Sequence, residues 1–315
     1  MVSKKLLQIS TKDMSRSEWL QQRRKSIGGS DAAGIIGLSK WSSPYKVWAD
    51  KTGRLPDTED NEPLRLGRDL EAYVAQRFTE ATGKKVRRWQ AMLYNPDYPF
   101  AHADIDRWVI GENAGLECKT TSTLDTKQFK GVEFPEKYYA QCVHYMAVTG
   151  ADRWYLAVLV FGRGFYIYTL ERDQAEIDAL MAAERDFWPC VEADTPPAPD
   201  GAEATTDTLT TIHAESMDTG MELFGRETML TEYSRLKEQR KAIDSRIGEI
   251  ENTIKNDMKE AERGSCGSFK VLWKTQERRT FQTRAFEKAY PDIDLTPFYR
   301  TSTARPFKVT EFKEE

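Results

Sequence analysis

The hydrophobic pattern of the first fifty residues predicts three short helices. A Ser-x-x-Glu capping box at Ser15 predicts the start of the first helix, over residues 15–25, and a third is expected over 44–51. Ser30 and Asp31 suit the N-cap region of the second helix. Because the N-terminus of a helix attracts anions, Ser30 is a candidate phosphate contact as well as a plain helix cap.

A longer helix is predicted over residues 63–82, ending before a glycine. On a helix, residues three and four positions apart lie on the same face. Glu71 therefore shares a face with Gly67, Val74 and Phe78. We expect this carboxylate to point along an apolar stripe toward the interior.

From residue 91 onward the periodicity changes to that of strands. The pattern predicts an antiparallel meander, a helix over 135–148, a hairpin and a closing helix over 174–191. The predicted strands cover 92–94, 100–109 and 116–121 in the meander, and 154–161 and 165–170 in the hairpin. This order favours an α/β (α+β) fold with a mixed central sheet flanked by helices.

The chain divides by composition into a catalytic domain over 1–192, a linker over 193–220 and a C-terminal module over 221–315. The module begins with a long helix whose apolar residues recur at near-heptad spacing, which predicts an interaction or oligomerisation element. A strand is expected at 269–273, with 307–312 as its mate. The heptad residues are Met229, Tyr233, Leu236, Ile243, Ile247, Ile250 and Ile254.

Composition excludes several classes of protein. No stretch approaches the roughly 20 apolar residues of a membrane helix, and the first residues do not form a signal peptide, so we expect a cytoplasmic protein. The cysteines show no paired spacing, which argues against a zinc site or a disulfide framework. The three histidines are too scattered for a histidine-metal nuclease, and no Gly-rich nucleotide-binding loop is present.

The formal net charge of -4 is unfavourable for a DNA-binding protein, because Lys and Arg dominate contacts to phosphate. Basic residues nevertheless outnumber acidic ones from Lys4 to Arg54, whereas acidic residues gather at 57–62 and after Glu171. A metal-using nuclease is expected to mix the signs in this way, with carboxylates for cations and basic residues for the DNA backbone.

The central chemical signal is Asp106 followed by Glu117-Cys118-Lys119 on the next strand. Residues two apart on a strand share a face, so Glu117 and Lys119 point together while Cys118 points to the opposite layer. Asp106 on the neighbouring strand can face them, and two converging carboxylates favour a hard cation such as Mg²⁺ or Mn²⁺. A neutral Lys119 acting as a base would need a lowered pKa.

Two readings stay open at this stage. A Glu-x-Lys pair on a strand is most often a surface ion pair, so the surrounding residues have to distinguish an ion pair from a catalytic pair. Asp104 and Asp106 lie on the same face of the predicted strand, and either could reach the cation. We favour Asp106.

The ordered set of a Glu on a helix, an Asp ending one strand and Glu-x-Lys on the next resembles the PD-(D/E)xK nuclease superfamily. The run Arg-Arg-Lys-Ser-Ile-Gly-Gly-Ser-Asp-Ala from Arg23 and the run Tyr-Tyr-Ala-Gln from Tyr138 narrow this. Together they resemble the YqaJ-type viral recombinase family, relatives of the phage lambda exonuclease. The resemblance covers about residues 15–191 and implies a restriction-endonuclease-like core with the C-terminal helical and β module as an appendage.

The resemblance also implies roles for single residues. Asp106, Glu117 and the Cys118 carbonyl would bind Mg²⁺, with Mn²⁺ as a substitute, and Glu71 would support the metal site. Lys119 would act on the attacking water. The remaining implied roles are the DNA 5′-phosphate pocket of Arg23 and Ser30, with Arg24 as a rival to Arg23, and positioning of the catalytic groups by Gln141 and Tyr138.

The activity implied is a 5′ to 3′ exonuclease that digests one strand of linear double-stranded DNA and leaves a 3′ single strand for an annealing protein. A homo-oligomer, such as a trimeric ring, and expression from a phage or prophage in a bacterial host follow from the same resemblance. A noncatalytic DNA-end-binding adaptor and an endonuclease of the same superfamily are the alternatives. Digestion of linear duplex separates the first alternative, and cutting of closed circles the second.

Overall fold

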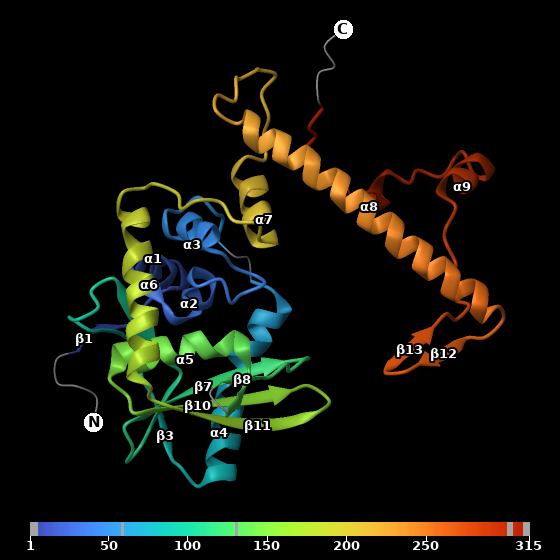
Figure 1. Cartoon of the computed structure of the whole chain (residues 1–315). Helices are drawn as coiled ribbons and strands as arrows, with labels where there is room; N and C mark the ends of the chain where they lie inside the picture. The colour runs from blue at the N-terminus through green and yellow to red at the C-terminus, as the bar shows by residue number, and fades with distance from the viewer. Residues whose placement is uncertain (1–5, 58–59, 130–131, 301–304, 311–315) are drawn as a thin grey trace. The chain divides into compact units, whose positions relative to one another are not determined.

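The computed structural model describes residues 6–57, 60–129, 132–300 and 305–310 (Figure 1). The chain divides into two compact units, Met1–Ala214 and Glu215–Glu315. The first unit holds the predicted catalytic residues, so its architecture decides how they meet.

The helices of the N-terminal region begin and end close to the predicted positions. α1 (Arg16–Arg24) has the capping box, with Ser15 accepting the Glu18 N–H, and is followed by β2 (Ile27–Gly28). α2 (Gly29–Ile35) has Gly28 as its N-cap, so Ser30 lies in its first turn. The other two helices of this region are α3 (Pro44–Lys51) and α4 (Glu62–Thr82).

A five-stranded mixed sheet in the order β11-β10-β7-β6-β3 forms the centre of the unit. β7 and β10 are parallel and the other neighbours are antiparallel. The predicted mixed sheet flanked by helices is therefore confirmed. The strands are β3 (Val86–Arg88), β6 (Arg107–Val109), β7 (Ala114–Thr121), β10 (Arg153–Val160) and β11 (Gly164–Glu171).

The two faces of this sheet are covered by different helices (Figure 1). Val74 and Phe78 of α4 pack with Cys118 on one face, whereas Trp154 and Leu156 pack with α5 (Glu136–Thr149) on the other. Side chains at alternate positions of β7 thus enter different layers. Cys118 lies in the α4 layer, and its neighbours along β7 face α5.

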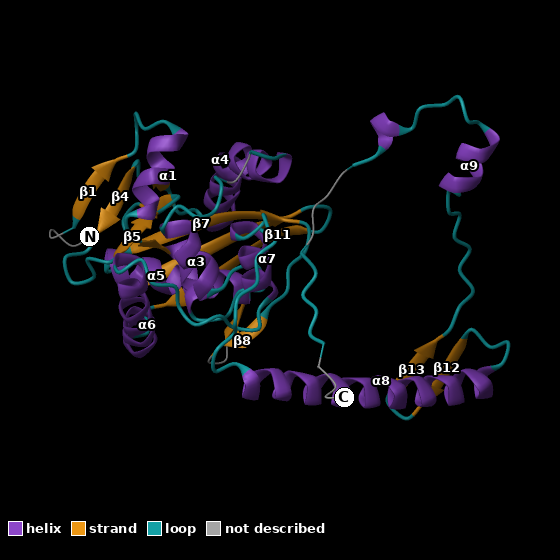
Figure 2. Cartoon of the chain, turned by 90° about the horizontal axis from the view of Figure 1, so that it is seen from above, coloured by secondary structure: helices purple, strands orange, loops and turns teal. Residues whose placement is uncertain are grey.

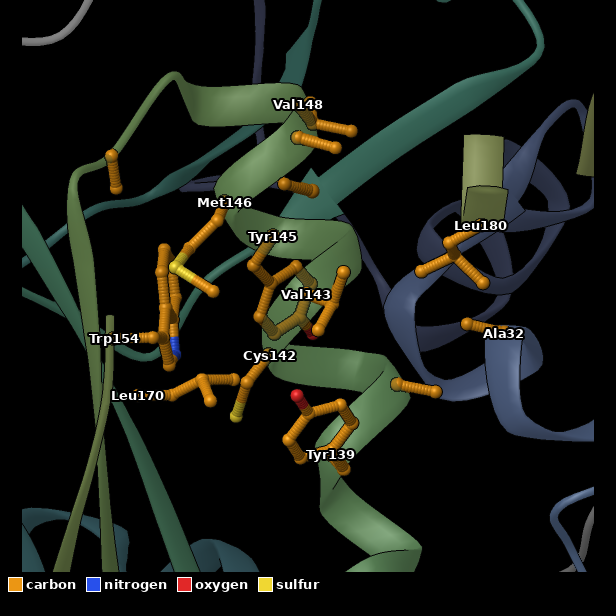
Figure 3. Close-up of a cluster of buried hydrophobic side chains, with 14 of the residues drawn as sticks. Ala32, Tyr139, Cys142, Val143, Tyr145, Met146, Val148, Trp154, Leu170 and Leu180 are labelled. Atoms are coloured by element: carbon orange, nitrogen blue, oxygen red, sulfur yellow. The ribbon is translucent and has the colours of Figure 1, made fainter. Parts of the chain in front are cut away.

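Packing between α5 and the sheet is close (Figure 3). The centres of the Tyr145 and Trp154 rings lie 5.2 Å apart, with Met146 and Leu170 beside them. A Cβ at Gly115 of β7 would come within 2.2 Å of the Trp154 ring, so only glycine fits there. The layer is therefore filled, and α5 is held at a fixed distance from β7.

The predicted meander is correct in its antiparallel neighbours, β4 with β5 and β6 with β7, but wrong in placing them in one sheet of three strands. β1 (Leu7–Ser10), β4 (Ala91–Tyr94), β5 (Ala101–Asp104) and β2 form a second sheet, while β6 and β7 belong to the first. The expected single strand over 100–109 breaks after Asp104. The reason is that the Asp106 side chain, rather than a backbone carbonyl, accepts the N–H of Cys118 at 2.7 Å. The chain crosses from one sheet to the other at this point.

Two further segments complete the unit. β8 (Lys127–Phe129) and β9 (Val132–Phe134) form a hairpin before α5, and α6 (Gln174–Glu192) packs on α5. The range predicted as a linker contains α7 (Glu203–Ile212), whose Thr205 hydroxyl donates to Ser43 at 2.7 Å. Composition alone missed this helix, which packs against α3, and the unit ends further along the chain than expected.

The second unit contains the long helix α8 (Glu227–Met258), a single uninterrupted helix (Figure 2). β12 (Arg263–Cys266) pairs with β13 (Phe269–Leu272), so the mate predicted for β13 at 307–312 is wrong. Residues 307–310 form no strand, and 311–312 lie outside the described residues. The positive φ of Gly267 permits the tight turn between these strands. α9 (Thr283–Ala289) and a 3₁₀ turn (Thr296–Phe298) follow.

Two compositional expectations can be compared with the described residues. Within them, none of the helices has the length and apolar character of a bilayer-spanning segment. All four cysteines are free thiols, and Cys118 and Cys142 are buried.

Candidate active site

The predicted catalytic residues line one cavity of about 770 Å³ in the first unit. Its walls come from α1, α2, α4, α5 and both sheets. Among the lining residues are Arg23, Ser30, Glu71, Asp104, Asp106, Glu117, Lys119 and Gln141.

Glu117 and Lys119 lie on the same face of β7, as their spacing predicts. The Lys119 Nζ is 2.6 Å from Glu117 Oε1, and the Glu117 side chain is 3 % exposed. Gln141 of α5 donates to the same oxygen at 2.7 Å. The other oxygen, Oε2, is buried and has no hydrogen-bond partner among the described residues. A buried carboxylate oxygen without a partner is costly, which points to a missing ligand.

Asp106 lies beside this pair, between β5 and β6. Its Oδ2 accepts the N–H of Cys118, so the carboxylate is held at the edge of β7 that β6 no longer covers. The N–H and C=O of one residue point to the same side of a strand. The Cys118 carbonyl therefore points toward Asp106 as well.

The electrostatics of the two carboxylates are unfavourable among the protein's own charges. Burial and the neighbouring Glu117 raise the pKa of Asp106 well above its ordinary value. Burial also raises the pKa of Glu117, although Lys119 opposes the shift. A bound cation would stabilise the charged forms of both carboxyl groups and so lower their pKa values.

The pKa of Lys119 is raised as well, which for a lysine favours the charged form. Burial alone would lower the pKa of Lys119, but the charges of Glu117 and Asp106 raise it above its ordinary value. The ammonium form is therefore favoured by the protein's own charges. This is opposite to the lowered pKa that a neutral base would need.

Glu71 does not reach the two carboxylates directly. Its Oε1 accepts a hydrogen bond from Arg107, which also donates to the Asp106 carbonyl at 2.7 Å. Glu71 lines the cavity, so its role at the site runs partly through Arg107, whose guanidinium holds the Asp106 backbone.

The choice between Asp104 and Asp106 is informed by their partners. Asp104 Oδ2 accepts a hydrogen bond from Trp19 Nε1 at 2.7 Å. Burial raises the pKa of Asp104, and the bond from Trp19 partly offsets this shift. The charges of both Asp104 and Asp106 act on the site, but only Asp106 has Glu117 and Lys119 among the causes of its own pKa shift and bonds to β7 through the Cys118 N–H. The geometry favours Asp106 as the cation ligand and Asp104 as a residue that fixes Trp19.

Another part of the cavity wall is basic, and we call Arg23, Gly29 and Ser30 its anion end. Arg23 Nη2 donates to Ser30 Oγ at 2.6 Å, and the guanidinium lies 4.8 Å from the centre of the Trp19 ring. Arg24 instead pairs with Asp57 at 2.6 Å and does not line the cavity. The geometry therefore favours Arg23 over Arg24.

The structure places Tyr145, rather than the predicted Tyr138, in the wall of the cavity. Lys119 Nζ lies 5.5 Å from the centre of the Tyr138 ring, but Tyr138 does not line the cavity. Tyr145 lines it, and its hydroxyl accepts a hydrogen bond from Gln141 at 3.0 Å. Its position four residues after Gln141 on one helix face was the available signal.

The residues present fit a hard divalent cation such as Mg²⁺. Asp106, Glu117 and the Cys118 carbonyl are hard oxygen donors, and Asp106 is bonded to the residue that follows Glu117. Mg²⁺ keeps several waters in addition to one or two carboxylates, so these few donors suit it. Within the described residues there is no cluster of three or more His, Cys, Asp or Glu side chains suited to a metal. A larger cage of side chains, such as a structural zinc site, is therefore not found there.

Comparison with known proteins identifies the family. Residues 18–152 match the YqaJ-like viral recombinase domain. The uncharacterised protein YqaJ of Bacillus subtilis (strain 168) is 40% identical over 288 residues, which are 89% of this chain and 90% of that protein. The chain belongs to the YqaJ-like viral recombinase family. The family match spans α1 to the start of β10 and so contains the predicted catalytic residues.

Two solved structures are similar to part of this family member. An alkaline exonuclease from Laribacter hongkongensis is 18% identical, with a TM-score of 0.43 over 57% of this chain and 94% of that one. A phage-related exonuclease from Haemophilus somnus 129PT is 14% identical, with a TM-score of 0.42 over 54% and 96%.

Proposed function

We propose that this chain is a Mg²⁺-dependent exonuclease that hydrolyses linear double-stranded DNA. One observation carries the proposal: a half-buried carboxylate, Asp106, and a buried one, Glu117, lie beside Lys119 in a cavity that basic side chains also line. Carboxylates for a cation next to basic groups for phosphate are what phosphodiester hydrolysis requires. Mn²⁺ is expected to substitute for Mg²⁺.

Each residue then has a definite task. When bound, the metal ion would supply Lewis-acid stabilisation of charge on the scissile phosphate. Lys119, kept as an ammonium by its acidic neighbours, orients the attacking water and stabilises charge on the phosphate oxygens. Gln141 fixes Glu117 Oε1 through its hydrogen bond, and Tyr145 fixes Gln141 in turn.

The anion end supports a preference for the 5′ end. Arg23 and Ser30 present a guanidinium and a hydroxyl to the same cavity as the carboxylates, and guanidinium groups bind phosphate strongly. A terminal 5′-phosphate bound there would place the chain end near Lys119. The product expected is a 3′ single strand, the substrate of a strand-annealing partner.

The test uses linear duplex labelled at either end, with Mg²⁺ or with a chelator. We expect nucleotide release from 5′-phosphorylated ends in Mg²⁺ alone, and a Lys119→Ala variant that binds duplex but releases none. Cutting of covalently closed circles would show an endonuclease. Binding of duplex ends without release in Mg²⁺ or Mn²⁺ would show a noncatalytic adaptor.

We also propose that α8 brings copies of the chain together. Six of its seven seam residues are exposed within the second unit, for example Ile243 at 60% and Ile247 at 50%, and Tyr233 is half-buried. A heptad seam of this length is typical of helices that pair. Light scattering of the full chain should give an oligomer, and a double Ile243→Asp and Ile247→Asp variant a smaller particle. An unchanged mass in the variant would remove this role.

A further inference from the structure

Lys51 of α3 lies directly behind the anion end. Its side chain is 1% exposed, and its Nζ lies 2.6 Å from Asp31 Oδ2. The same Nζ donates to the Arg23 carbonyl at 2.9 Å. Neither Lys51 nor Asp31 lines the cavity, whereas Arg23 and Ser30 do. The pair therefore acts on the anion end from behind.

The partners of the pair are the ends of two helices. The Arg23 carbonyl belongs to the last turn of α1, where carbonyls have no acceptor role within the helix. Asp31 Oδ2 also accepts the N–H of Gly28, the N-cap of α2, at 2.8 Å. Lys51 and Asp31 thus tie the end of α1 to the start of α2, the two segments that carry Arg23 and Ser30.

Lys51 and Asp31 balance each other's charge, so the positive charge of Arg23 remains available to the cavity. Lys51 and Asp31 form a close ion pair, and Arg23 forms no ion pair among the described residues. A buried ion pair is weak evidence for stability, because the cost of removing both charges from water offsets their attraction. A positional role explains better why a lysine is buried here, where its three donors can reach a carboxylate and a helix-end carbonyl together.

We propose that Lys51 and Asp31 are positioning residues that fix Arg23 and Ser30 for a terminal 5′-phosphate. The inference rests on the proposed nuclease function. It predicts that the pair controls discrimination between 5′-phosphorylated and 5′-hydroxyl ends, and leaves the hydrolytic step unchanged.

The experiment compares kcat and KM on linear duplexes that differ only in the 5′-phosphate. A double Lys51→Met and Asp31→Asn variant removes both buried charges together, and its folding is checked by thermal melting. We expect its KM for phosphorylated ends to rise about tenfold, because a misplaced binding group loses much of its effect. Its kcat, and its KM for hydroxyl ends, should match wild type.

Two further variants separate position from charge and from general damage. Lys51→Arg keeps a cation between Asp31 and the Arg23 carbonyl and should retain most of the discrimination. This variant also tests the proposal if the double variant does not fold. Lys46→Met removes a half-buried lysine of the same helix, whose Nζ donates to the Trp41 carbonyl, and should change neither kcat nor the two KM values.

The possible results are distinct. Wild-type discrimination in a folded double variant would overturn the proposal, as would an equal loss on both substrates. Loss of discrimination in Lys51→Arg equal to that in a folded double variant would overturn the role given to Lys51 as the cation that joins Asp31 to the Arg23 carbonyl. A wild type that releases nucleotides without preferring 5′-phosphate would also overturn the proposal, yet leave the nuclease function standing. A wild type that releases none would contradict the nuclease function itself.

Discussion

The two ends of the cavity differ in how their charges are compensated. At the carboxylate end, burial raises the pKa values of both Asp106 and Glu117, and the charge of Glu117 raises that of Asp106 further. At the anion end, burial would raise the pKa of Asp31, but Lys51 and Arg23 lower it to about 2. Under the proposed function, a cation from solution would complete the carboxylate end, whereas the anion end already contains its cations. The proposal therefore assigns the cofactor to one end and a preorganised set of protein charges to the other.

The largest effect that would sharpen this comparison is on catalysis at the carboxylate end. Glu117→Gln removes a negative charge that the proposed metal ion would bind, while keeping the size of the side chain. We expect kcat for linear duplex to fall by about 10²- to 10³-fold, the scale seen when a group that stabilises transition-state charge is removed. Duplex binding by the variant, measured by anisotropy, should be retained.

Metal-dependent stability is the next largest effect. A ligand at 100 times its dissociation constant stabilises the folded state by about 2.7 kcal/mol. Mg²⁺ should therefore raise the free energy of unfolding of wild type, measured by denaturant titration, by about that amount. Glu117→Gln should show little response, and without metal it should be no less stable than wild type, because the repulsion with Asp106 is gone. An equal Mg²⁺ response in both proteins would remove the claim that this end binds the cation.

Acid should affect the anion end in a defined window. The folded pKa of Asp31 lies below its ordinary value, so its contribution to stability is present above about pH 4 and lost as pH falls toward 2. A shift from 3.8 to about 2 corresponds to roughly 2 kcal/mol. The destabilisation caused by Asp31→Asn should therefore shrink by about that much between pH 5 and pH 2. Asp57→Asn, which removes an exposed partner of Arg24, serves as the control.

The smallest effect separates the two neighbouring arginines. Arg23→Ala should weaken binding of 5′-phosphorylated ends by about tenfold, the loss of a charge-assisted contact. Arg24→Ala should change it less than twofold, because Arg24 is engaged with Asp57 outside the cavity. An equal rise in KM for the two variants would mean that the phosphate is bound by general basic charge rather than at the anion end.

Local sequence rules predicted the helices and the facing of the catalytic strand well. The capping box at Ser15 and the glycine after α4 set helix ends through neighbouring residues, so spacing was sufficient. The common side of Glu117 and Lys119 followed from the twofold periodicity of strands.

Long-range contacts account for what the sequence did not reveal. The break after Asp104 depends on a bond from Asp106 to Cys118, twelve residues away. The helix α7 depends on packing against α3, including the bond between Thr205 and Ser43 across 162 residues. The buried Lys51 likewise has no local signal, since its partners lie on two other helices.

The most direct test of the account is the position of a divalent ion in crystals of the protein grown with Mn²⁺, read from its anomalous scattering. The account predicts a peak within coordination distance of Asp106, Glu117 Oε2 and the Cys118 carbonyl. A fully occupied ion elsewhere in the cavity, with the Glu117 oxygen still without a partner, would contradict it.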